Sequence, residues 1–200
     1  MSILVVGGTG TIGSAVVEAL GDREVVVAGH TSGEVQVDLA DPSSIDRLYE
    51  TVGPVDAVLS CAGEAAFGGL TELTDEEFEM SLSNKLMGQV TLVRRGLDAI
   101  GDDGVFTLTS GVLSQEPMEG SAAISLVNAG LEGFVRAAAL EMPRDVRVNA
   151  VSPPWVEETL DAMGADYAPS LPAEAVAKAY LASLNGTQNG AVIDARDVAE

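Results

Sequence analysis

Cysteine and histidine are almost absent from this sequence of 200 residues, which has only Cys61 and His30 of these types. A single cysteine cannot form a disulfide within the chain, and no cluster of thiolates is available to hold a metal ion. One imidazole added to one thiol is also too small a set for a structural zinc site. We therefore predict a protein with neither an internal disulfide nor a bound metal.

Basic residues are scarce as well, since 10 lysines and arginines stand against 31 aspartates and glutamates, a formal net charge of −21. Only Lys85 and Lys178 are lysines. This balance excludes a nucleic-acid partner, because binding to phosphates requires a basic surface. The acidic residues are dispersed over the chain, which is typical of proteins in concentrated salt, where screening suppresses self-repulsion. An acidic protein from ordinary salt is the alternative.

Long apolar runs are missing too, and none approaches the roughly 20 residues needed to cross a bilayer. The first run, Ile3 to Val6, follows Met1 and Ser2 without a basic leader and enters a glycine-rich turn. It is therefore predicted to be the first strand of the fold rather than an export signal. We expect a cytoplasmic protein with no membrane partner.

Short apolar runs instead alternate with helical patterns from end to end, which predicts βαβ units on a parallel sheet. The expected strands span residues 3–7, 24–29, 35–38, 55–60, 104–109, 146–151 and 190–194. The clearest helices are expected at residues 12–20, at 42–52, from 75 to about 100, and from about 121 or 124 to 140. The fold class is therefore α/β. We predict one doubly wound Rossmann-type domain over residues 1–200, with a seven-stranded parallel sheet flanked by helices.

A glycine-rich turn lies between the first strand and the first helix, with the sequence Gly7-Gly8-Thr9-Gly10-Thr11-Ile12-Gly13. Glycines allow the backbone to approach a pyrophosphate, whose charge is met by the amino terminus of the helix. A purely structural turn is the alternative, but the position at the start of a βαβ array favours dinucleotide binding. The predicted contacts from this turn are Gly7, Thr9, Gly10, Thr11, Ile12 and Gly13.

The second strand ends in Gly29-His30-Thr31-Ser32, where a carboxylate would be expected if the ribose of the adenosine carried free hydroxyls. Hydroxyl groups and an imidazole tolerate a 2′-phosphate, so the sequence favours NADP over NAD. His30 and Thr31 are the candidate contacts. A solvated loop position is the alternative interpretation of His30.

Further motifs follow in order: Val37-Asp38-Leu39, Ser60-Cys61-Ala62-Gly63, the helical stretch 131–141, and the strand and turn Val146 to Pro153. Together they resemble the short-chain dehydrogenase/reductase family over nearly the whole chain. The resemblance implies a nicotinamide-dependent oxidoreductase acting on a small carbonyl or alcohol. It also implies further cofactor contacts at Asp38, Leu39, Cys61, Ala62, Gly63, Pro153 and Val156.

The two long helices would, by the same resemblance, form the interface of a homodimer or homotetramer. Arg94, Arg95 and Arg136 would pair with acidic neighbours there, although a solvated face is the alternative. Pro154 replaces the glycine expected in the turn near the nicotinamide. The segment 157–170 is short for a substrate lid, which indicates a small or open substrate site.

The catalytic residues of that family match only in part. Ser110 stands at the serine position, but Ile124 stands at the tyrosine position and Asn128 at the lysine position. Lys85 occupies the position of the family's asparagine, so lysine and asparagine are exchanged. We predict Ser110, Lys85 and Asn128 as catalytic residues, with Lys85 supplying positive charge and a proton. The alternative is that Lys85 merely crosses a helix interface.

No Tyr-x-x-x-Lys motif occurs in the chain, and the resemblance places Tyr49, Tyr167 and Tyr180 away from this site. Two hypotheses of function follow. The first is an NADP-dependent oxidoreductase with a non-standard active site. The second is an inactive NADP-binding sensor or regulatory protein, which Ile124 favours. A scaffold without a cofactor conflicts with the intact glycine turn.

Overall fold

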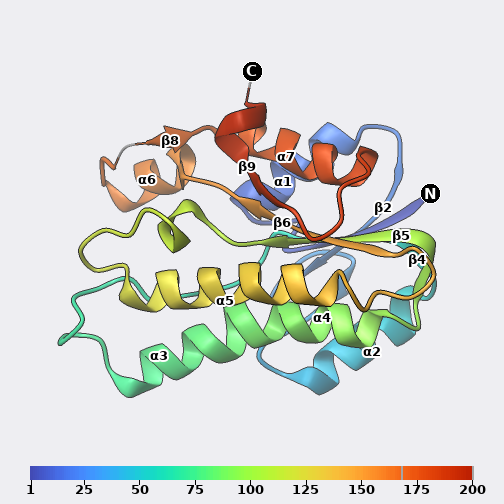
Figure 1. Cartoon of the computed structure of the whole chain (residues 1–200), viewed down its shortest axis with the longest axis horizontal. Coiled ribbons are helices and arrows are strands. Elements are labelled where there is room, and N and C mark those ends of the chain that lie inside the picture. Colours follow the sequence, from blue (N-terminus) through green and yellow to red (C-terminus); the bar gives the residue numbers. More distant parts are fainter. Residues whose placement is uncertain (168, 200) are drawn as a thin grey trace.

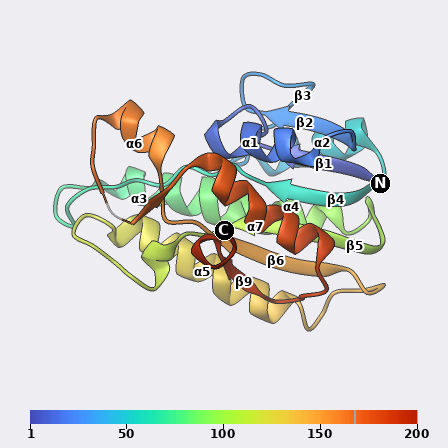
Figure 2. The same ribbon diagram turned by 90° about the horizontal axis from the view of Figure 1, so that it is seen from above.

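The computed structural model describes residues 1–167 and 169–199, and in this part of the chain seven parallel strands form one sheet (Figures 1 and 2). The strand order is β3-β2-β1-β4-β5-β6-β9. Their bounds are β1 Ser2–Val6, β2 Glu24–Gly29, β3 Val35–Gln36, β4 Val55–Ser60, β5 Ile100–Thr109, β6 Arg147–Ser152 and β9 Val192–Asp194. The order reverses between β1 and β4, and such a reversal opens a crevice at the carboxyl ends of the strands.

Helices cover both faces of the sheet (Figure 1). α1 and α7 lie on one face and α2, α4 and α5 on the other. The α-helical bounds are α1 Thr11–Leu20, α2 Pro42–Val52, α3 Asp75–Ser81, α4 Gln89–Gly96, α5 Ala122–Ala138, α6 Glu157–Met163 and α7 Ala173–Asn185. A π-helix, Leu82–Gly88, joins α3 to α4, and 3₁₀ turns occupy Val112–Ser114 and Ala195–Val198.

Strand β1 shows how the sequence divides the core into two layers. Leu4 and Val6 belong to the cluster that packs against α2, α4 and α5, whereas Ile3 and Val5 belong to the cluster that packs against α1 and α7. Successive side chains of a strand point to opposite faces, so a strand buried on both faces is apolar throughout. The uninterrupted run Ile3 to Val6 therefore follows from a central strand in a doubly covered sheet.

Helix starts follow from local capping chemistry. The Asp41 carboxylate accepts a hydrogen bond from the Ser43 amide at 2.9 Å, and Pro42 occupies the first helical position of α2. At α3, Thr74 Oγ1 accepts from the Glu77 amide at 3.2 Å while the Glu77 carboxylate accepts from the Thr74 amide at 2.7 Å. This reciprocal capping box fixes the start of the helical segment that carries Lys85.

The predicted sheet is confirmed, and the expected strands 24–29 and 55–60 and the helix 42–52 have the predicted bounds. The expected helix from 75 to about 100 is wrong in two respects. Residues 82–88 in its middle are π-helical. The helical segment ends at Gly96, and β5 begins at Ile100 rather than at residue 104. The short parallel pair β7 Trp155–Val156 and β8 Ser170–Leu171 was not expected. No helix in the described residues combines the length and apolarity needed to span a bilayer.

Candidate functional site

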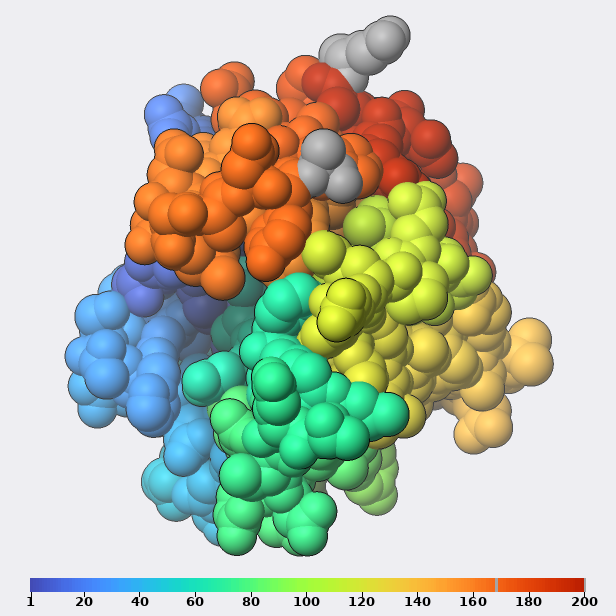
Figure 3. Space-filling model, turned by 90° about the vertical axis from the view of Figure 1, so that its left-hand side faces the viewer, coloured from blue at the N-terminus to red at the C-terminus, as the bar shows by residue number. Residues whose placement is uncertain are grey.

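A crevice of about 390 Å³ opens at the carboxyl ends of β1, β2 and β4. The molecule is hollowed here, where the blue amino-terminal part of the chain faces the green and orange segments (Figure 3). The crevice is lined by glycines, apolar residues and a few polar residues: Val6, Gly7, Gly29, His30, Val37, Asp38, Leu39, Ala62, Gly63, Glu64 and Asn84. A crevice at this place in a doubly wound sheet suits an elongated nucleotide.

Two glycines of the turn between β1 and α1 leave no room for a side chain. Gly7 has a φ of +80°, and a Cβ there would lie 2.7 Å from the Cβ of Ala62. A Cβ on Gly13 would lie 2.0 Å from the carbonyl oxygen of Gly7. The amide of Gly7 donates to the Ala28 carbonyl at 2.7 Å, which holds the turn against β2. The residues present therefore fit the close approach of a pyrophosphate.

Helix α1 begins at this turn without a side-chain cap, because its N-cap is Gly10. The first amides of a helix lack partners within the helix, and its dipole favours negative charge at this end. The amino terminus of α1 is thus open to an anionic group in the crevice. Thr9 and Gly10 are exposed at the same turn.

The end of the crevice near β2 contains no carboxylate from the strand end. His30 lines it and is exposed, while the nearby Glu34 carboxylate is engaged with the Val27 amide at 3.1 Å. Ser32 Oγ donates to Thr9 Oγ1 at 3.1 Å and so ties the loop after β2 to the glycine turn. On the far wall, the Asp38 carboxylate accepts from the Ala40 amide at 2.9 Å.

A second cavity, of about 220 Å³, lies at the ends of β5 and β6. Lys85, Ser110 and Asn128 all line it, although they come from the π-helix, the residue after β5, and α5. The other walls are mostly apolar: Ile12, Val112, Leu113, Ile124, Pro153, Pro154, Trp155 and Val156, with Thr109, Gly111 and Thr159. The structure thus brings the three predicted catalytic residues into one pocket.

Lys85 lies in the middle of the π-helix and is only 7% exposed. Burial lowers the pKa of its ammonium to about 8, because the charged form loses hydration. Within residues 1–167 and 169–199 no carboxylate lies within ion-pairing distance of it. Lys85 is therefore not a solvated helix residue. An unpaired ammonium in an apolar cavity can bind an acceptor group of a ligand.

The backbone around Lys85 is fixed by a buried glutamine. Gln89 Nε2 donates to the carbonyls of Lys85 at 3.1 Å and Thr109 at 3.0 Å, and its Oε1 accepts from the Thr109 amide at 2.8 Å. On its other side, Lys85 packs so closely on Gly63 that a Cβ there would lie 2.9 Å from Lys85 Cγ. The π-helix is therefore held at fixed distance from both β4 and β5.

Asn128, which lines the same cavity as Lys85, has a buried acceptor without a partner in the described residues. Its Nδ2 donates to the Gly111 carbonyl at 3.4 Å, whereas its buried Oδ1 has no hydrogen-bond partner in the described part of the chain. Leaving a buried acceptor unpaired costs about 1–3 kcal/mol. The unpaired oxygen can therefore accept a hydrogen bond from a bound ligand or from the Lys85 ammonium.

Ser110 is oriented by the Glu132 carboxylate and by the backbone of Asn128. Its Oγ lies 3.0 Å from Glu132 Oε1 and 3.3 Å from the Asn128 carbonyl oxygen. Glu132 is 1% exposed and lies one turn after Asn128 on α5. Its burial could not be predicted from the sequence, because a charged residue inside an amphipathic helix is ordinarily expected at the surface.

Tyr167 does not line the second cavity, but it contacts a residue of its wall. Its ring stacks on Trp155 with centroids 5.0 Å apart, and Phe67 meets Trp155 edge-on at 5.4 Å. Trp155 forms part of the cavity wall, so an aromatic cluster of Phe67, Trp155 and Tyr167 borders the pocket. Tyr180 is also near: its hydroxyl lies 2.5 Å from Thr109 Oγ1, but it belongs to the core on the α7 side of the sheet.

Several predicted cofactor contacts line one of the two cavities: Gly7, His30, Asp38, Leu39, Ala62, Gly63, Ile12, Pro153 and Val156. Others do not: Thr9, Gly10, Thr11, Gly13, Thr31 and Cys61. Cys61 packs in the core cluster with α7, and burial raises the pKa of its thiol to about 12. The thiol therefore belongs to the core on the α7 side, whereas Thr9, Gly10, Thr11 and Thr31 are exposed and Gly13 is buried at the start of α1.

The sheet order and the position of the crevice define the doubly wound α/β class whose members bind dinucleotides at this edge. Residues 12–192 match the family described as Enoyl-(Acyl carrier protein) reductase. Bovine L-xylulose reductase (Bos taurus) is 30% identical over 169 residues, which are 75% of this chain and 69% of the relative. The chain belongs to the short-chain dehydrogenase/reductase family of oxidoreductases.

Solved structures agree with this assignment. The protein lin1944 from Listeria innocua superimposes with a TM-score of 0.93 at 42% identity, covering 97% of this chain and 98% of the other. A small-chain dehydrogenase solved in complex with NADPH superimposes with a TM-score of 0.85 at 26% identity, covering 97% of this chain and 95% of the other. The similarity therefore extends over almost the whole length of both chains.

Removing the buried amine of Lys85 is expected to stabilise the fold. The folded-state pKa of about 8 is below the ordinary 10.5, so the ammonium opposes folding below pH 8 and this cost disappears as the pH rises to 10.5. Lys85→Met should therefore raise the free energy of unfolding at pH 7 by roughly 1–3 kcal/mol. The advantage over wild type should shrink between about pH 8 and 10.5.

Urea unfolding followed by circular dichroism at several pH values measures this difference. Lys178→Met is the matched control, because Lys178 is exposed on α7. Equal, pH-independent effects of the two substitutions would contradict the burial of an unpaired ammonium at position 85.

Proposed function

We propose that this chain is an NADPH-dependent oxidoreductase that interconverts a small carbonyl compound and its alcohol. The observation that carries the proposal is the unpaired ammonium of Lys85 in an apolar cavity with Ser110, next to a crevice suited to a dinucleotide. The naming of relatives as reductases and the NADPH complex of a structural neighbour support the same class of reaction.

The dinucleotide would be held by the turn of Gly7 and Gly13, by His30 near the 2′ position, and by Asp38 and Gly63 along the crevice. When bound, NADPH supplies the hydride. The protein's part is to bind the carbonyl, to exclude water and to handle one proton. Pro153 and Val156 would border the nicotinamide end, because they line the second cavity.

Lys85 takes the role of charge and proton donor in this proposal. Its ammonium donates to the carbonyl oxygen and stabilises the negative charge that develops there as hydride arrives. A pKa of about 8 keeps it protonated at neutral pH while making it a better acid than an ordinary lysine. Asn128 Oδ1, which lacks a partner in the described residues, would orient the ammonium.

The shape and lining of the cavity favour a small substrate with apolar substituents. About 220 Å³ is available, and the walls are mainly aliphatic apart from Trp155, two threonines and the three predicted catalytic residues. Burial of such substituents contributes about 25 cal/mol per Å² of apolar surface removed from water. The aromatic cluster of Phe67, Trp155 and Tyr167 would cover the outer side of the bound molecule.

A second candidate, an NADP-binding sensor without turnover, is favoured by Ile124, which contributes no proton donor to the cavity. Assays of purified protein with NADPH and a panel of small aldehydes and ketones separate the two. Wild type should oxidise NADPH, and Lys85→Ala should lower kcat by roughly 100-fold or more, because a general acid contributes about 10²–10⁴-fold.

Lys178→Ala is the control in the same assay and should keep the wild-type rate. Tight binding of NADPH by calorimetry without turnover of any carbonyl would favour the sensor. Failure to bind either nucleotide would reject both functions.

The preference for NADPH depends on the absence of a carboxylate at the end of β2. His30→Asp should lower the affinity for NADPH by at least about tenfold, because the new carboxylate repels a 2′-phosphate, and should improve NADH binding by accepting from the ribose hydroxyls. Calorimetric titration with both nucleotides measures the change. The uncharged control His30→Asn should leave the ratio of affinities near wild type, and an equal effect of both would contradict the electrostatic cause.

We further propose that the protein is a homodimer or homotetramer built on α4 and α5. Leu97, Phe134 and Met142 line an apolar groove between these helices at the surface. Of the three arginines considered for the interface, Arg95 pairs with Asp46 at 3.4 Å and Arg136 with Glu132 at 3.1 Å within the same chain. Light scattering at micromolar concentration should give a multiple of 20.5 kDa for wild type and a lower mass for Phe134→Glu.

A further inference from the structure

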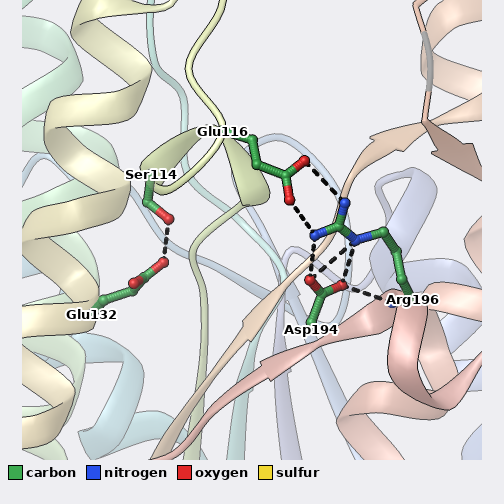
Figure 4. A network of polar contacts seen from close by, with 5 residues as sticks. All are labelled: Ser114, Glu116, Glu132, Asp194 and Arg196. Atoms are coloured by element: carbon green, nitrogen blue, oxygen red, sulfur yellow. Dashed lines mark hydrogen bonds and ion pairs between the residues drawn. The ribbon is translucent and has the colours of Figure 1, made fainter.

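The hydroxyl group of Ser110 already has acceptors for its hydrogen. Its Oγ lies 3.0 Å from Glu132 Oε1 and 3.3 Å from the Asn128 carbonyl oxygen, and both partners belong to α5. Figure 4 shows that the hydroxyl of Ser114 meets the same carboxylate. A serine has one hydrogen to donate and two lone pairs that accept. The single hydrogen of Ser110 is therefore directed to α5.

Glu132 acts only as an acceptor in this arrangement. Its Oε1 accepts from Ser110 and Ser114, and its Oε2 accepts from Gln115 and Arg136, both at 3.1 Å. A carboxylate that accepts from these donors, one of them a guanidinium, offers no hydrogen in return. In the described part of the chain no donor reaches Ser110 Oγ. Ser110 therefore presents lone pairs, and no hydrogen, to the cavity that it lines.

Asn128 adds a second acceptor to the same cavity. Its Nδ2 donates to the Gly111 carbonyl at 3.4 Å, and a Cβ on Gly111 would lie 2.8 Å from this nitrogen. Turning the amide over would set Oδ1 against the Gly111 oxygen, with two acceptors facing each other. Oδ1 is thus the end without a partner in the described residues. The donor for this oxygen has to come from Lys85 or from a bound molecule.

The hydrogen-bonding groups of the cavity are thus a charged donor and two acceptors. Lys85 only donates, because an ammonium has no lone pair. Of the two threonines in the wall, Thr109 donates to the Ser60 carbonyl at 2.5 Å, while the Thr159 hydroxyl can donate or accept. A carbonyl compound without a hydroxyl group accepts from Lys85 but leaves the lone pairs of Ser110 without a donor. Displacing water from a buried acceptor without replacing its hydrogen bond is unfavourable.

We propose that Ser110 is a hydrogen-bond acceptor that selects a hydroxyl group on the substrate, an inference that rests on the proposed function. The substrate class is a small hydroxy ketone or hydroxy aldehyde. Its carbonyl oxygen accepts from Lys85 and its hydroxyl donates to Ser110 Oγ, while Asn128 Oδ1 has lone pairs for the ammonium and for a further hydroxyl. A cavity of about 220 Å³ limits the length of the substrate, so the hydroxyl lies within about two carbons of the carbonyl.

Three ketones test this selection in steady-state reduction by NADPH. Methoxyacetone keeps the oxygen and the electron-withdrawing effect of hydroxyacetone but cannot donate a hydrogen bond. Butanone has the size of hydroxyacetone, with a methyl group in place of the hydroxyl. Wild type should favour hydroxyacetone over both by about tenfold or more in kcat/KM, because each analogue leaves a buried acceptor unpaired. Equal kcat/KM for the three ketones would overturn the inference.

Ser110→Ala separates the hydrogen bond from a structural role. Loss of the acceptor should reduce the preference for hydroxyacetone over methoxyacetone by about tenfold. A purely structural role would lower both rates together and leave their ratio unchanged, and that result would overturn the inference. Ser114→Ala is the matched control, because Ser114 contacts the same Glu132 oxygen but does not line the cavity. This control should keep the wild-type ratio.

Binding to the NADP⁺ complex gives the same comparison without turnover. Dissociation constants from ligand-observed NMR should show that wild type binds hydroxyacetone about tenfold more tightly than methoxyacetone or butanone. Equal affinities would overturn the inference even if Ser110→Ala does not fold. Absence of turnover of every carbonyl compound in wild type would reject the proposed function. Reduction of hydroxyacetone and methoxyacetone with equal kcat/KM would instead reject only the selection by Ser110.

Discussion

The buried side chain of Gln89 joins the two elements on which the site is built. Its amide bonds to Lys85 on the π-helix and to Thr109 at the end of β5, the residue before Ser110. Because buried amides are costly to leave unpaired, both elements are held at the separation that satisfies all three hydrogen bonds. The pocket between Lys85 and Ser110 therefore has a fixed width set by a residue that does not line it.

The fold could be predicted from the sequence because its signals are local. Strands such as 24–29 and 55–60 are bounded by turn residues, and the Asp41-Pro42 start of α2 has a strong capping pattern. The π-helix 82–88 could not be predicted, since one added residue in a turn leaves the apolar pattern of a long helix nearly unchanged. The pair β7 and β8 is too short to leave a pattern.

The sequence singles out three residues that the structure brings together, but not the residues that hold them in place. Ser110, Lys85 and Asn128 could be predicted as candidates because their positions follow recognisable motifs, and all three line one cavity. Glu132 and Gln89 act through burial and long-range contacts, which no spacing in the sequence encodes. The same reason places the Cys61 thiol in the core on the α7 side and Tyr167 against Trp155. Side-chain direction and loop path are decided by tertiary packing.

The position of Trp155 has a practical consequence. It is the only tryptophan of the chain, and it lies in the wall of the proposed substrate cavity, stacked on Tyr167. All indole emission of the protein thus originates at one place, beside the pocket and away from the rest of the core. The molecule carries an intrinsic fluorophore that reports events in this cavity without a label, with no background from tryptophan elsewhere.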